Sequence, residues 1–213
     1  MKRSIVLIVM AAVVLSSCER VFTSSPFEFL QRDPASYDEA QKVTFAEDAL
    51  ASGDEAAMAA AFDLLIDSTD PETQLIAVEL ALGAAGVGSA LTTVVAGLVA
   101  EGADPETVIT DALDAFTDAD LALLVSAAGL LDQADDSITP TAEQYAFVAI
   151  GLIAAAADDA GGLGNLDPPP ADSDAEAYVA QAADFLAEAV ALLAAEGGST
   201  DILDGFTDLI PAI

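Results

Sequence analysis

The chain has 213 residues, of which 37 are aspartate or glutamate and five are lysine or arginine, so its formal net charge at pH 7 is −32. Such a surface repels phosphate backbones and anionic headgroups, which argues against a nucleic-acid-binding function. Because 54% of the residues are hydrophobic, the chain lacks the low hydrophobicity of disordered acidic proteins, and we expect a folded body.

The first 18 residues have the features of an export signal. A basic head, Met1 to Arg3, precedes an apolar run from Ile5 to Val14 that is too short to span a bilayer as a mature helix. The sequence Leu15-Ser-Ser-Cys18 that follows resembles the lipobox of bacterial lipoproteins. The resemblance implies that residues 1–17 are removed and that Cys18 carries a diacylglyceryl thioether and, on its new amino group, a fatty acyl chain such as palmitate.

A lipidated Cys18 predicts a membrane anchor on the extracytoplasmic side. Each buried lipid methylene contributes about 0.8 kcal/mol, so two or three chains hold a protein stably on a membrane. Glu19, rather than an aspartate, follows the cysteine, and the resemblance then favours the outer membrane, facing the periplasm or the surface. The alternative is an ordinary secretory signal followed by a free thiol.

The mature part is polarised in charge. Residues 18–33 are expected to form a lipidated N-terminus and tether, and residues 34–213 a helical domain. Only Arg20, Arg32 and Lys42 oppose the 37 acids there, and no lysine, arginine or histidine occurs from Val43 to Ile213. The acidity is consistent with a solvated acidic face, with salt adaptation, or with a surface that binds divalent cations.

Proline punctuation predicts an all-α fold built from a repeated unit. Prolines at positions 34, 71, 105, 140 and 170 are 37, 34, 35 and 30 residues apart. The first three follow Asp33, Asp70 and Asp104 and the fourth follows Thr139, and each of these residues could cap a helix that begins at the proline. A turn signal lies within each interval. We therefore expect stacked antiparallel helical hairpins, an α-solenoid of about nine helices; the alternative is an irregular helical bundle. The predicted helices are 35–51, 54–67, 71–84, 89–100, 105–116, 118–133, 141–158, 173–196 and 200–210.

The repeat length resembles that of tetratricopeptide repeats. The characteristic aromatic, glycine and alanine positions of that family do not align on every unit, and only scattered matches such as Ala-Leu-Ala-Ser-Gly-Asp at 49–54 occur. The resemblance therefore concerns architecture and not membership.

One uncharged segment, Leu80 to Ala100, is long enough to span a bilayer. Glycines interrupt it and no lysine or arginine flanks it, so we expect two core helices joined by a turn at 86–89. Among the aromatic residues, the phenylalanines expected in the core are Phe62, Phe116, Phe147, Phe185 and Phe206.

Residue types exclude several kinds of catalysis. The chain has no histidine, and its one cysteine is assigned to the lipid, so it cannot form a Ser–His–Asp or Cys–His site or a histidine–cysteine zinc site. Phosphate chemistry lacks a lysine in a glycine-rich loop. A carboxylate glycosidase remains as an alternative, but we expect no enzyme.

Calcium is the metal that a carboxylate-rich chain would favour, because hard cations take oxygen ligands. The candidate ligands are Asp158, Asp159 and Asp167, which surround a glycine-rich turn with Asn165. Two further acidic groups, Asp132/Asp135/Asp136 and Asp172/Asp174/Glu176, are less complete, and none fits the full calcium-loop pattern. No other cofactor is expected.

These patterns lead to two functional hypotheses. The first is a lipid-anchored envelope protein whose helical-repeat body is a scaffold for a partner protein. The second is a lipoprotein that binds a small ligand or cation, serving a transporter.

Replacing Cys18 by serine tests the anchor. In a bacterial host fed radiolabelled palmitate, we expect the unchanged chain to be labelled and to sediment with membranes, because the thiol accepts the lipid. C18S should lose the label, whereas Ser17→Ala, which keeps a small residue before the cut, should retain it. Equal labelling of C18S and the unchanged chain would contradict the prediction.

Overall fold

The computed structural model describes residues 34–98, 105–133, 139–170, 173–198, 200 and 203. The chain divides into two compact units, Met1–Tyr37 and Asp38–Ile213. The described part of the first unit is the 3₁₀ turn η2 (Pro34–Ser36), after which the Tyr37 amide donates to the Pro34 carbonyl at 3.1 Å. All elements discussed below belong to the second unit.

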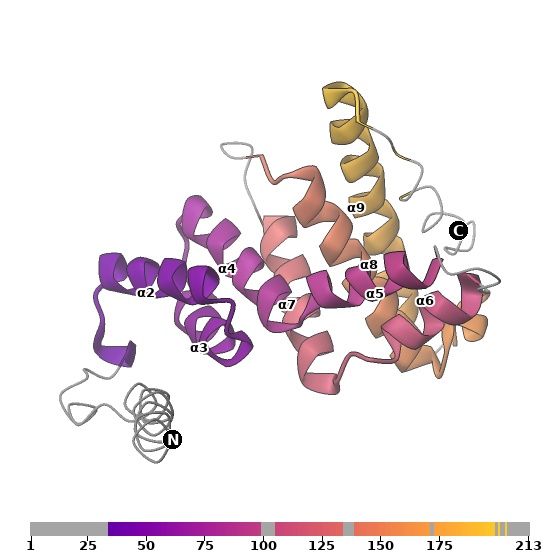
Figure 1. Ribbon diagram of the computed structural model, residues 1–213, viewed down its shortest axis with the longest axis horizontal. Coiled ribbons are helices and arrows are strands. Elements are labelled where there is room, and N and C mark those ends of the chain that lie inside the picture. The colour runs from indigo at the N-terminus through magenta and orange to yellow at the C-terminus, as the bar shows by residue number, and fades with distance from the viewer. Residues whose placement is uncertain are drawn as a thin grey trace, which may run out of the picture. The chain divides into compact units, whose positions relative to one another are not determined.

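The second unit is helical, and the described residues contain no strand. Its elements are coloured along the chain in Figure 1. They are α2 (Glu39–Ser52), α3 (Glu55–Leu65), α4 (Pro71–Ala84), α5 (Val87–Leu98), α6 (Pro105–Leu113), α7 (Asp118–Gln133), α8 (Ala142–Ala160), the 3₁₀ turn η3 (Leu163–Asn165) and α9 (Ala175–Glu196). The all-α prediction is confirmed, and the first eight predicted helices correspond in order to α2 through α9. The ninth, 200–210, lies outside the described residues apart from Thr200 and Leu203.

Aspartate caps start two helices where the sequence predicts them. The Asp54 side chain accepts from the Ala57 amide at 2.9 Å at the start of α3. Asp70 accepts from the Thr73 amide at 2.9 Å and from the Thr73 hydroxyl at 2.7 Å, with Pro71 in the first turn of α4. These bonds satisfy amides that have no partner within the helix.

Helices α5 and α9 begin at Val87 and Ala175, two residues from the predicted 89 and 173. Two of the starts predicted at prolines are wrong, for one physical reason. Helix α2 begins after Asp38 and not after Asp33, and α8 begins after Thr141 and not after Thr139. In both, a reciprocal capping box replaces the proline start: the cap side chain accepts the amide of the third helical residue, whose glutamine side chain accepts the cap amide.

Helix ends follow the predicted turns. The left-handed Gly53 (φ 67°) ends α2, and Gly161 (φ 76°) ends α8. After α8, the Gly162 amide donates to the Ala157 carbonyl at 2.6 Å, which closes a Schellman-type end. Glycine adopts this conformation without the steric penalty that a Cβ imposes.

The uncharged segment 80–100 contains the two expected helices, but the turn lies at 85–86 and not at 86–89. Helix α5 is only partly a core helix, because Val87 and Val94 are buried whereas positions 88, 89, 92 and 93 are exposed. Helix α4 ends at Ala84 and α5 begins at Val87, and the two are bent by 54° at this break. By length and composition α9 could also cross a membrane, and α4 with α5 could form one broken span. The core helices of soluble proteins can have the same length and composition, so these two properties do not show that any of these helices crosses a membrane.

Helices α4 and α8 organise the core. Helix α4 packs against α2, α3, α5, α7 and α8, and α8 packs against both α7 and α9. From Val148 to Ala157 every residue of α8 is buried. Helix α4 contacts α7 although α5 and α6 lie between them in the sequence, so packing is not confined to helices that are neighbours along the chain.

Close helix crossings occur at glycines. A Cβ added at Gly151 of α8 would lie 2.9 Å from both Cβ and Cδ1 of Leu124 on α7. One added at Gly97 of α5 would lie 2.5 Å from Cγ1 of Val108 on α6. Real Cβ atoms do not approach so closely, so these pairs of helices pack at a separation that requires glycine.

Gly151→Ala tests the crossing of α8 with α7. Because the root of Leu124 cannot swing away, we expect overpacking to cost about 1–3 kcal/mol of unfolding free energy. The gain in helix propensity, about 1 kcal/mol, offsets only part of this cost. The matched control is Gly129→Ala in α7, where a new Cβ meets nothing within 4 Å, and it should stabilise the protein. Urea denaturation measures both, and equal stabilisation of the two variants would contradict the close crossing.

Candidate functional site

Several candidate residues from the sequence lie outside the described part of the chain. They are Cys18 and the acids Asp135, Asp136 and Asp172. Lipidation of Cys18 therefore stays a prediction.

Asp159, a candidate calcium ligand, caps a helix. Its Oδ2 accepts a hydrogen bond of 3.0 Å from the amide of Ala175, the first residue of α9. The residue directly before α9, Asp174, makes no side-chain capping bond. Asp159, which lies 16 residues before Ala175 in the chain, therefore caps α9 in place of a neighbouring residue. Its hydrogen bond links the end of α8 to the start of α9.

An open cleft of about 370 Å³ lies beside this cap. Its walls come from α7, α8 and α9. The polar lining residues are Asp158, Asp159 and Tyr178, and the apolar ones are Leu121, Ala122, Val125 and Ala155. Burial raises the pKa of the Tyr178 phenol, and the negative charges of Asp174 and Asp159 raise it further. A tyrosine phenol is already protonated at neutral pH at its ordinary pKa, and the raised pKa moves its ionisation further from neutrality, so Tyr178 can donate a hydrogen bond.

The calcium candidates are not gathered around one point. Asp167 lies in the loop between η3 and α9 and does not line the cleft of Asp158 and Asp159. Among the described residues, no three of the types histidine, cysteine, aspartate and glutamate are grouped so that they could hold a metal ion. Calcium binding stays a prediction without a geometric site.

A larger open cleft, of about 630 Å³, lies between the start of α2 and the loop that joins α3 to α4. It contains Lys42, the last cation of the chain, whose Nζ lies 2.8 Å from the Glu39 carboxylate. Asp67, Asp70 and Thr73 line the opposite side. The hydroxyl and the amide of Thr73, both donating to Asp70, hold the pKa of that carboxyl below its ordinary value.

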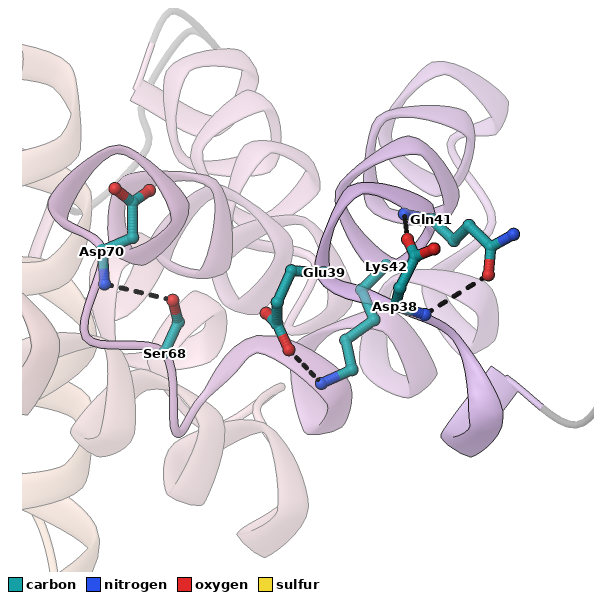
Figure 2. A network of polar contacts seen from close by, with 6 residues as sticks. All are labelled: Asp38, Glu39, Gln41, Lys42, Ser68 and Asp70. Atoms are coloured by element: carbon teal, nitrogen blue, oxygen red, sulfur yellow. Dashed lines mark hydrogen bonds and ion pairs between the residues drawn. The ribbon is translucent and has the colours of Figure 1, made fainter.

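The polar contacts around this cleft serve local structure. Figure 2 shows the Asp38–Gln41 capping box beside the Lys42–Glu39 pair, and the Asp70 amide donating to the Ser68 hydroxyl at 3.2 Å. All of these bonds join residues two or three positions apart and organise the starts of α2 and α4.

A third cleft, of about 310 Å³, lies where α4 meets the first turns of α8. Leu82 and Phe147 line it together with Glu79, Glu143, Thr141 and Gln144. Gln144 is only 6% exposed, and its Nε2 donates to Glu79 Oε1 at 3.2 Å. This hydrogen bond links two helices that are 65 residues apart in the chain.

Comparison with known proteins gives no assignment. No protein family, curated protein or solved structure matches the chain. The function must therefore be argued from these clefts and from the sequence.

Sequence reasoning missed the residues of the α4–α8 cleft. Thr141-Ala-Glu-Gln144 has the spacing of a capping box, which could have placed Gln144 in the first turn of α8. Nothing in the sequence indicates that Gln144 meets Glu79, since that contact depends on tertiary packing. Phe147, expected in the core, is half-buried and lines the cleft.

Asp159→Ala tests the long-range cap. We expect it to lower the unfolding free energy by about 1 kcal/mol, because the Ala175 amide loses its acceptor. Asp158→Ala is the control, since it removes the same charge from an adjacent exposed position. The difference between the two variants in urea denaturation isolates the cap, and no difference would contradict its assigned role.

Proposed function

We propose that this protein is a lipid-anchored envelope protein whose helical body is a non-enzymatic scaffold for a partner protein. The observation that carries the proposal is the set of open clefts between helices, in which apolar side chains lie beside carboxylates. Clefts of this kind can receive side chains of another protein. The anchor is Cys18, because the sequence before it resembles a lipobox, and the location is the outer membrane, with the body facing the periplasm or the cell surface.

Stacked hairpins, as in an α-solenoid, belong to the same proposal. The near-regular proline spacing supports this arrangement, as does the packing of α3 on α4 and of α8 on both its neighbours α7 and α9. The contact of α4 with α7 is the main departure from packing between successive helices.

Crosslinking in native membranes tests the scaffold. The reagent should join carboxylates, because Lys42 is the only cation among the described residues. We expect one protein neighbour, joined through acids that border the clefts, such as Glu79 or Asp158. Detection of lipid-anchored protein without any protein neighbour would contradict the scaffold.

Ligand or cation binding, in the service of a transporter, is the second candidate. The cleft beside Lys42 favours it, because about 630 Å³ is a volume typical of small-ligand sites and charges of both signs line it. Calcium is the cation to test. A melting temperature that rises in calcium chloride, but not in sodium chloride of matched ionic strength, would support this function, and equal effects of both salts would count against the calcium form.

A further inference from the structure

In the α4–α8 cleft, one exposed carboxylate accepts a hydrogen bond from a buried side chain that orients it. The Thr141 amide donates to Gln144 Oε1 at 2.8 Å, and Gln144 Nε2 donates to Glu79 Oε1 at 3.2 Å. The Gln144 side chain is buried, so both its ends are fixed, whereas the Glu79 residue is exposed. An oriented surface carboxylate loses less side-chain entropy when it binds a partner than a freely rotating one does.

The surroundings of Glu79 suit a flat cation with an apolar stem. Phe147 and Leu82 provide an apolar wall and Glu143 provides a second carboxylate. A guanidinium can lie against an aromatic ring while its N–H groups donate to carboxylates, and its methylene stem packs on apolar surface. An ammonium is more strongly hydrated and cannot bind as a planar fork.

No cation of the described body competes for this cleft. Lys42 is the only one present, and it is paired with Glu39 and lines a different cleft. The other two clefts are less suited to an incoming arginine. In one, Lys42 is already present; in the other, Asp159 already caps α9.

We propose that the α4–α8 cleft receives an arginine side chain of the partner protein, with Glu79 as its main contact and Gln144 as the positioning residue for Glu79. This inference rests on the proposed scaffold function and specifies its partner as one that presents a basic segment. The complementarity of charge follows from a body that carries no cation beyond Lys42.

Titration with N-acetylarginine amide, followed by NMR, tests the cleft on the full chain. We expect saturable shifts at the Gln144 side-chain amide and at the Phe147 ring. N-acetyllysine amide should bind more weakly, and sodium chloride of matched ionic strength should not reproduce the shifts. Glu79→Gln should weaken the binding about tenfold or more, because hydrogen bonds between charged groups are the stronger ones.

Matched variants separate the cleft from the general acidity. Glu47→Gln removes the same charge from an exposed position of α2 that lines none of the three clefts, and it should leave the arginine titration unchanged. Phe147→Leu keeps an apolar side chain but removes the aromatic face, and it should weaken arginine more than lysine. Shifts spread over the whole acidic surface, or equal loss in E79Q and E47Q, would overturn the inference.

Failure of this inference can be told from failure of the scaffold. Crosslinking that finds a protein neighbour, together with an arginine titration that leaves Gln144 and Phe147 unshifted, rejects the cleft and retains the scaffold. An arginine-specific site without any protein neighbour in the membrane rejects the scaffold and the partner arginine together.

Discussion

Burial of α8 is the constraint on which the rest of the body depends. This helix packs against α7 and α9, touches α4, and is buried at every residue from Val148 to Ala157. A helix enclosed in this way can carry polar side chains only near its ends. Glu143 and Gln144 therefore border one cleft at its start, and Asp158 and Asp159 border another at its end. The close packing that stabilises the core also determines where the carboxylates of these two clefts lie.

Charged residues stabilise the starts of the helices in this fold but not their ends. Helices α2, α3, α4, α7, α8 and α9 each have an acid in the first turn, which interacts favourably with the positive end of the helix dipole, and none of them has a base in the last turn. The acids also repel one another, and dissolved salt screens this repulsion. The fold thus tolerates its charge through helix-start interactions, apolar burial and counter-ions, and the residues that the structure describes contain one ion pair, Lys42–Glu39, rather than a network.

Signals local in the sequence predict where the helices begin and end, whereas the contacts between helices depend on long-range packing. Gly53, Asp54, Asp70 and Gly161 each mark a helix boundary that the sequence indicates, because caps and left-handed turns depend on residues close in the chain. Pro34 and Pro140 give wrong predictions of a helix start, because each precedes a capping box that starts the helix a few residues later. The contact of α4 with α7, the Glu79–Gln144 bond and the cap from Asp159 to α9 join residues that no periodic pattern relates.

The position of Lys42 has a practical consequence for proteolysis. Trypsin cleaves after lysine and arginine, and the sequence offers it no site beyond Lys42. This residue is the fourth of α2, and its side chain is 22% exposed and paired with Glu39. One cut there releases Val43–Ile213 as a single tryptic peptide, free of whatever the N-terminal part of the chain is attached to. Routine tryptic mapping of a membrane sample would then identify this protein only through the two short peptides between Arg20, Arg32 and Lys42. A protease that cuts beside acids would instead divide its helices into fragments that can be identified.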